Sequence, residues 1–125
     1  MKINVLVVDD EEKNRKLLDA ILKAENYNVL QAEDGETALK IVQSQQVDII
    51  ILDIMMPGMD GYEVCEKIKT SKFTQNIPII MLTAKDMDHG LVEVAKKKAN
   101  FYIVKPFDSK VLVAQIGRML KDKKT

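Results

Sequence analysis

Five polar residues follow short apolar runs of the sequence, at the points where those runs end. Asp9 and Asp10 follow the first run and Asp53 follows the third, while Thr83 and Lys105 follow the fourth and the fifth. Three carboxylates held close together repel one another, so at neutral pH either one of them takes up a proton or a cation lies between them. Carboxylate oxygens, a backbone carbonyl and water are the ligands of hard divalent cations, and Mg²⁺ fits this set best.

The same residue types could carry out phosphoryl transfer. An aspartate can act as the nucleophile and form an aspartyl phosphate. The metal and a lysine would neutralise charge on the transferred group, and a threonine hydroxyl would donate one hydrogen bond to it. Taken singly, an aspartate after a strand more often caps a helix, so Asp9 could cap the first helix and Thr83 could cap a turn. The joint occurrence at four strand ends favours the functional interpretation.

The elements that must position these residues alternate in kind. Short β-branched runs predict strands at residues 3–8, 27–32, 47–52, 77–82 and 101–104. Helical spacing of apolar residues predicts helices over residues 11–24, from 34 or 35 through 42, over 62–69, about 88–98 and 109–120. This alternation predicts an α/β fold with a parallel sheet covered by helices on both faces. The carboxyl ends of its strands would converge on one crevice, where ligands bind.

Composition bounds the class of protein. The 125 residues fit one domain, predicted over 1–121, with 122–125 as a tail or the start of a linker. The 19 basic and 19 acidic residues cancel, so no overall positive field favours nucleic acid or an anionic membrane. No segment predicts a signal peptide or a membrane span. A single cysteine, Cys65, is expected to be buried on a helix, and it fits a reducing compartment, so we expect a cytoplasmic location.

Four segments together resemble the receiver domain of two-component response regulators, in the CheY-like superfamily. They are VVDDE at 7–11, ILDIMMPGMDG at 51–61, MLTAK at 81–85 and VKPF at 104–107. The resemblance covers essentially the whole chain, in order and with normal spacing. It implies a flavodoxin-like, doubly wound (βα)5 fold whose five-stranded parallel sheet has the order 2-1-3-4-5.

The resemblance also implies the residues that carry the chemistry. Asp53 is similar to the phosphoacceptor of the family. Asp9 and Asp10 are similar to the acidic pair that holds Mg²⁺ together with Asp53, and the backbone carbonyl of Met55 would be a further ligand. Lys105 is similar to the lysine that the family places beside the phosphoryl group.

Three further residues resemble positions of the family, two of them positions that transmit the signal. Thr83 resembles the switch hydroxyl, which moves to bond the phosphoryl oxygen, and Tyr102 resembles the aromatic switch residue. Tyr102 could equally be a half-buried tyrosine on an edge strand. Pro106 is similar to a proline preceded by a cis peptide bond. Phosphorylation would then shift the face formed by the fourth helix, the fifth strand and the fifth helix.

The implied function is that of a signalling domain. It would take a phosphoryl group from a histidine kinase or a phosphotransfer protein, catalyse only its own phosphorylation and dephosphorylation, and act on a partner or an output domain. It would be a monomer or a weak, phosphorylation-dependent dimer. Two other classes stay open: a phosphorylation-independent binding module on the same fold, and a phosphohydrolase with an aspartyl nucleophile. The hydrolase family places an Asp-x-Asp after its first strand, whereas this chain has the adjacent pair Asp9–Asp10.

Several positions depart from the family pattern. Lys98 stands where a glycine is usual, and Asn100 and Phe101 replace a frequently acidic pair. Gln115 occupies a place often held by arginine in DNA-binding relatives. Those acids and that arginine form intermolecular ion pairs, so their absence argues against that mode of dimerisation. The departures leave the predicted acceptor chemistry untouched.

Overall fold

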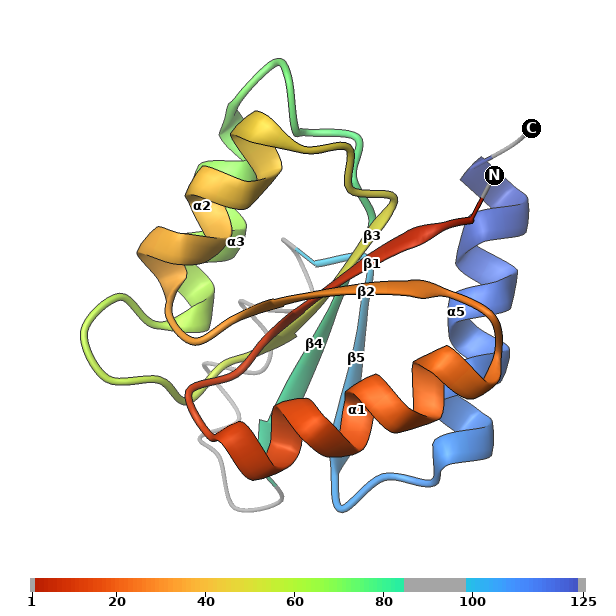
Figure 1. Cartoon of the computed structure of the whole chain (residues 1–125). Helices are drawn as coiled ribbons and strands as arrows, with labels where there is room; N and C mark the ends of the chain where they lie inside the picture. Colours follow the sequence, from red (N-terminus) through yellow and green to blue (C-terminus); the bar gives the residue numbers. More distant parts are fainter. Residues whose placement is uncertain (1, 85–98, 124–125) are drawn as a thin grey trace.

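The computed structural model describes residues 2–84 and 99–123, and its centre is a five-stranded sheet (Figure 1). Every neighbouring pair of strands is parallel. Across the sheet the order is β2 (Asn28–Ala32), β1 (Asn4–Val8), β3 (Ile49–Asp53), β4 (Ile79–Ala84) and β5 (Phe101–Lys105). The doubly wound fold and the order 2-1-3-4-5 are therefore confirmed.

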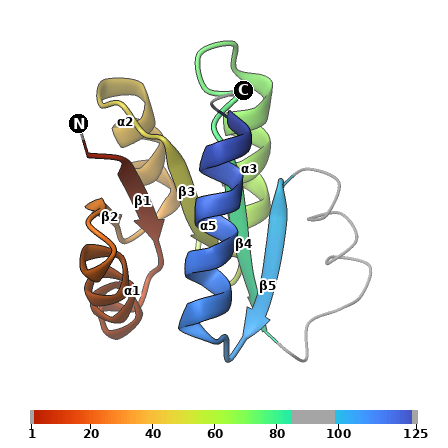
Figure 2. The same cartoon turned by 90° about the vertical axis from the view of Figure 1, so that its right-hand side faces the viewer.

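Helices cover both faces of this sheet; Figure 2 looks onto one face, with helices in front of the strands and behind them. The described helices are α1 (Glu12–Ala24), α2 (Gly35–Ser44), α3 (Gly61–Thr70) and α5 (Ser109–Lys123). Alternate side chains of each strand point to opposite faces, so the sheet separates two apolar cores. Val5 and Val7 face the core that is closed by Leu18 of α1 and Ile116 of α5. The opposite core is closed by α2 and α3 and contains Leu6, Val8, Ala38, Val64 and Ile68.

The central strand β3 is the most enclosed element of the sheet. All five of its residues are buried, from Ile49 to the functional candidate Asp53. Its neighbours β1 and β4 pair with it on both sides, so its backbone groups are satisfied within the sheet. By contrast, β2 and β5 are the two edges, and each has only one fully buried residue among its five.

Local signals fix where the helices begin. Asp34 accepts a hydrogen bond from the Thr37 backbone N–H at 2.7 Å, and so caps α2. Asp60 caps α3 in the same way, through the Glu63 N–H at 3.0 Å. The N-cap of α1 is Glu11, whose side chain makes no capping hydrogen bond. The start of α1 must therefore be held by other groups, which belong to the functional site described below.

Some expectations from the sequence need correction. Leu17 and Val111 stand at the helical spacing of apolar residues in α1 and α5, which predicts burial, but their side chains are 55% and 53% exposed. Periodicity shows which side of a helix is apolar, but it does not show how far the neighbouring sheet extends beneath that side. Cys65 is buried as predicted. The predicted helix over 88–98, including Lys98, lies outside the described residues.

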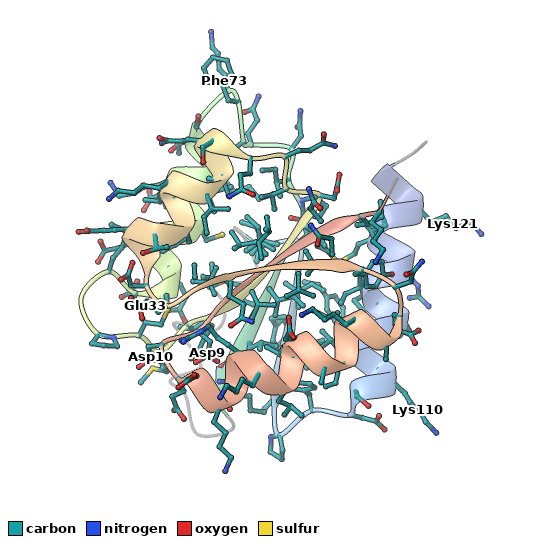
Figure 3. All side chains as sticks on the ribbon, in the orientation of Figure 1. Asp9, Asp10, Glu33, Phe73, Lys110 and Lys121 are labelled. Carbon is teal, nitrogen blue, oxygen red and sulfur yellow. The ribbon has the colours of Figure 1, made fainter. Side chains whose placement is uncertain are left out.

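The far end of the sheet carries an exposed aromatic side chain. Phe73, in the loop between α3 and β4, is 96% exposed and points away from the molecule in Figure 3. The loop behind it is held by hydrogen bonds from Thr74 Oγ1 to the Ile68 carbonyl and from Lys69 Nζ to the Ile77 carbonyl.

Among the described helices, none combines the length and apolarity that crossing a bilayer requires.

Candidate functional site at the carboxyl ends of the strands

The sheet brings polar residues together at the carboxyl ends of its strands. Asp9 and Asp10 follow β1 directly, Asp53 is the last residue of β3 and Lys105 is the last of β5. Figure 3 shows Asp9 and Asp10 at the start of α1, at the end of the molecule opposite Phe73. Thr83 lies within β4 instead of after it, because that strand continues to Ala84. Residues that are distant in the sequence thus meet where parallel strands end.

The three carboxylates form a compact group. One oxygen from each of Asp9, Asp10 and Asp53 lies within 4.8 Å of the others. Asp9 is fully buried and Asp53 is 5% exposed, whereas Asp10 faces solvent. The Lys105 Nζ lies 3.4 Å from Asp53 Oδ1 and 3.8 Å from Asp9 Oδ2. One ammonium group therefore faces two buried carboxylates.

Hydrogen bonds from the backbone orient both buried carboxylates. The Glu11 N–H donates to Asp9 Oδ1 at 2.9 Å, and the Met55 N–H donates to Asp53 Oδ1 at 3.2 Å. Asp9 Oδ2 is also buried, yet it has no hydrogen-bond partner in the described part of the chain. A buried carboxylate oxygen without a partner is costly in an apolar surrounding. A cation between the carboxylates would satisfy it.

Burial dominates the protonation equilibrium of Asp53. It raises the pKa of this carboxyl group above its ordinary value; the Lys105 ammonium group opposes the rise, and the Asp9 carboxylate adds to it. The attraction of Lys105 alone therefore does not offset the cost of burying the charged carboxylate. The chemistry of the donor set fits a divalent metal ion, since three carboxylates around one point are ligands that such an ion prefers.

The remaining predicted residues lie around this group. Thr83 is buried on β4, and Tyr102 is half-buried on the edge strand β5, where it packs against the core closed by α2 and α3. The Lys105–Pro106 peptide bond is cis, as the resemblance implies. The Met55 side chain is 61% exposed beside the site. The metal-binding role of the Met55 carbonyl, and the switch roles of Thr83 and Tyr102, stay predictions.

Two contributors to the site were missed by reasoning from the sequence. A Cβ atom placed on Gly61 would lie 2.6 Å from the Asp53 carbonyl oxygen and 2.7 Å from the Ile54 Cα. The absence of a side chain therefore lets α3 begin directly against the end of β3. The glycine after Asp60 is visible in the sequence, but the sequence does not show which atoms a side chain there would meet. The second residue, Arg15, contacts the Asp9 backbone, and nothing in the sequence marked this contact.

A groove of about 610 Å³ adjoins the carboxylates, between α1 and the segment that follows β5. Asp9 and Lys105 are among its lining residues, together with the apolar side chains of Leu17 and Phe107. The exposure of Leu17 thus has a structural reason, since this leucine forms part of an open groove instead of a closed core.

Comparisons with known proteins agree with this geometry. The response regulator receiver domain family matches residues 5–117. The chain is 42% identical to the response regulator PleD of Caulobacter vibrioides over 98% of its own length and 27% of that protein. It is 43% identical to the transcriptional regulatory protein ResD of Bacillus subtilis over 94% of its length and 48% of that protein. The chain thus spans half or less of each of these two relatives.

Solved structures share the fold along nearly the whole chain. The chemotaxis protein CheY4 of Vibrio cholerae superimposes with a TM-score of 0.87 at 30% identity, covering 95% of this chain and 99% of that one. The receiver domain of the sensor histidine kinase PA1611 from Pseudomonas aeruginosa gives a TM-score of 0.88 at 27% identity, covering 97% and 99%. That domain has a magnesium ion coordinated in its active-site cleft. With its five-stranded parallel sheet and its carboxylates gathered at one edge, this chain belongs to the family of response regulator receiver domains.

Proposed function

We propose that the protein is the phosphoacceptor domain of a two-component system, and that Asp53 receives the phosphoryl group. The observation that carries this proposal is the position of Asp53. It ends the buried central strand with Lys105 Nζ 3.4 Å from its Oδ1, and it shares a metal-binding geometry with Asp9 and Asp10. A carboxylate that is held rigidly beside a fixed ammonium group is suited to attack a phosphorus atom.

The proposed donor is a phosphohistidine on a histidine kinase or a phosphotransfer protein. A carboxylate oxygen of Asp53 attacks phosphorus, the bond between phosphorus and the imidazole nitrogen breaks, and its electron pair stays on the imidazole. The product is an acyl phosphate on Asp53. Lys105 neutralises charge on the phosphoryl oxygens, because its ammonium group already lies at the acceptor.

We propose Mg²⁺ as the metal, held by Asp9, Asp10 and Asp53 with the Met55 carbonyl. When bound, it would supply positive charge to the phosphoryl oxygens. The buried, unpartnered Asp9 Oδ2 supports this assignment from within this chain. The magnesium ion in the P. aeruginosa receiver domain supports it by analogy.

The output of the reaction is a change of conformation rather than a released product. Thr83 and Tyr102 lie on the neighbouring strands β4 and β5, where Thr83 pairs with Val104 and Met81 pairs with Tyr102. A phosphoryl group on Asp53 would attract the Thr83 hydroxyl, and the space it leaves would admit the Tyr102 ring. The face around β5 would then present a different surface to a partner or an output domain.

Incubation with acetyl phosphate and Mg²⁺, followed by intact-mass measurement, tests the proposal. We expect a mass increase of one phosphoryl group that is absent in Asp53→Asn and retained in the control Asp19→Asn, whose carboxylate pairs with Lys23 on α1. A protein that gains no phosphoryl group would be a phosphorylation-independent binding module. A protein that releases phosphate through many turnovers without a lasting adduct would be a phosphohydrolase.

A further inference from the structure

Arg15 makes a contact with the carboxylate site that its place in the sequence does not suggest. It lies in the first turn of α1, where its backbone N–H donates to the Glu11 carbonyl at 3.1 Å. Its side chain folds back toward the start of the helix, and Nη1 donates to the backbone carbonyl of Asp9 at 2.8 Å. Arg15 is half-buried and therefore held in place along part of its length.

This contact completes a set of hydrogen bonds that fixes Asp9. The Asp9 N–H donates to the Ala32 carbonyl at 3.1 Å, its Oδ1 accepts from the Glu11 N–H, and its carbonyl accepts from Arg15. Its fourth polar atom, Oδ2, has no hydrogen bond within the described residues and lies 3.8 Å from Lys105 Nζ. Every polar atom of Asp9 thus has a hydrogen bond except Oδ2, the oxygen that faces the Lys105 ammonium group.

We propose that Arg15 is a positioning residue, which holds the turn after β1 so that Asp9 Oδ2 is presented to a divalent cation. This inference rests on the proposed metal-binding role of the site. The turn needs such a group for two reasons. The N-cap residue Glu11 provides no side-chain cap, and the acidic run from Asp9 to Glu12 repels itself. A guanidinium group bonded to a carbonyl within that run holds the turn through its backbone and offsets part of the repulsion.

The neighbouring Lys16 has a different partner. Lys16 is also on α1, but its exposed ammonium group pairs with Glu12 at 3.3 Å, and that carboxylate is itself 70% exposed. Lys16 therefore carries the same charge at a similar distance along the helix without bonding to the turn. It provides a matched control for the effect of charge alone.

The positioning role and a general charge effect predict opposite changes in metal affinity. Removing a positive charge near three carboxylates would strengthen Mg²⁺ binding if Arg15 acted only through space. Releasing Asp9 would weaken it, because ligands must then be ordered when the metal binds. Loss of groups that orient metal ligands typically weakens metal affinity about 10- to 100-fold, and we expect about 10-fold here for Arg15→Gln.

The experiment is a calorimetric Mg²⁺ titration of the wild type, Arg15→Gln, Arg15→Lys and Lys16→Gln. We expect weaker binding in Arg15→Gln, a smaller loss in Arg15→Lys, and equal or slightly tighter binding in Lys16→Gln. In metal-free protein we expect faster hydrogen exchange of the Glu11 amide in Arg15→Gln only. This second measurement needs neither metal nor phosphate.

Arg15→Gln that binds Mg²⁺ as tightly as the wild type or more tightly would overturn the inference, as would an unchanged exchange rate of the Glu11 amide. If the wild type itself binds no Mg²⁺, the proposed metal site fails and this inference fails with it. Wild-type binding with an unaffected Arg15→Gln variant leaves the proposed function standing and removes only the role of Arg15.

Discussion

Lys105 and Asp53 end two strands that are separated by β4, yet Nζ of the lysine lies 3.4 Å from Oδ1 of the aspartate. The same nitrogen is 3.8 Å from Asp9 Oδ2. The lysine side chain thus reaches across a strand to the only two buried carboxylates that the described residues contain. This arrangement places a positive charge in a region that also suits a metal ion.

Replacing Lys105 with methionine should have opposite effects on metal binding and on phosphorylation. The pKa of Asp53 should rise further, because the ammonium group is the main influence that lowers it. Mg²⁺ should bind more tightly because a like charge is removed, whereas phosphorylation by acetyl phosphate should slow by about 10-fold or more. Carboxyl-carbon NMR titration, calorimetry and intact-mass time courses measure the three quantities. Lys110→Met, at an exposed position on α5, is the control and should change none of them.

Asp53→Asn should stabilise the metal-free protein near neutral pH. Burial raises the pKa of Asp53 in the folded state above its unfolded value of about 3.8. The folded state therefore binds this proton more tightly, and its contribution to stability is lost as the pH rises through the window between the two values. At neutral pH the buried carboxylate destabilises the wild type, and removing its charge should recover on the order of 1 kcal/mol.

Urea unfolding at neutral pH and at a pH well below 3.8 would measure this difference. The gain of Asp53→Asn over the wild type should shrink at the acidic pH, where the carboxyl group is neutral in both states. Asp10→Asn, at an exposed carboxylate of the same cluster, should show a smaller gain. A gain for Asp53→Asn that is equal at both pH values would contradict the assignment to charge burial.

Gly61→Ala and Gly117→Ala should change stability in opposite directions. The new Cβ at position 61 would meet backbone atoms of Asp53 and Ile54 at less than 3.0 Å, and backbone cannot move aside cheaply. We expect a loss of about 1–3 kcal/mol. At position 117, inside α5, nothing lies within 4 Å, and the alanine should add about 0.5–1 kcal/mol through helix propensity. Thermal and chemical unfolding of both variants measure these changes in stability. Similar changes for Gly61→Ala and Gly117→Ala would refute the steric argument.

Asn100 should prove structurally important even though it departs from the family pattern. Its Oδ1 accepts hydrogen bonds from Lys69 Nζ at 2.8 Å and from the Ile79 N–H at 2.9 Å. Asn100→Ala should cost about 1–3 kcal/mol, because both donors lose a partner. Asn100→Asp keeps both acceptor bonds and adds a charge opposite Lys69, whose pKa is lowered by burial, so it should be at least as stable as the wild type.

Chemical denaturation of these two variants and of Asn76→Ala, an exposed asparagine in the loop before β4, checks this prediction. Asn76→Ala should be close to neutral. Equal losses for the aspartate and alanine variants at position 100 would show that the two hydrogen bonds contribute little.

The sequence predicted the residues that alternation and strand ends can reveal. Asp53, Asp9 and Lys105 were placed at one edge because parallel strands end together, and the structure confirms that placement. Contacts through backbone atoms could not be predicted in this way. The bond from Arg15 to the Asp9 carbonyl and the approach of Gly61 to Asp53 depend on how two elements pack, which residue type and spacing do not specify.

The departure at Asn100 shows the same limit from another side. Compared with the family pattern, Asn100 only replaces an acidic residue that forms intermolecular ion pairs in DNA-binding relatives. In the structure it joins α3 to the start of β4 through Lys69 and Ile79. An exposed residue beside a strand can thus bind donors of its own chain, and only the fold shows which donors lie within hydrogen-bond distance.

The complete burial of β3 has a consequence for how the molecule opens. Strands that are enclosed on both faces and paired on both sides exchange their amide hydrogens only when the whole domain unfolds. We therefore expect Asp53 to belong to the last unit to open and the edge strands β2 and β5, which are less buried, to open earlier. A modification at Asp53 would act on its surroundings from a fixed point, and the motions that follow it must occur in the less protected elements around β3.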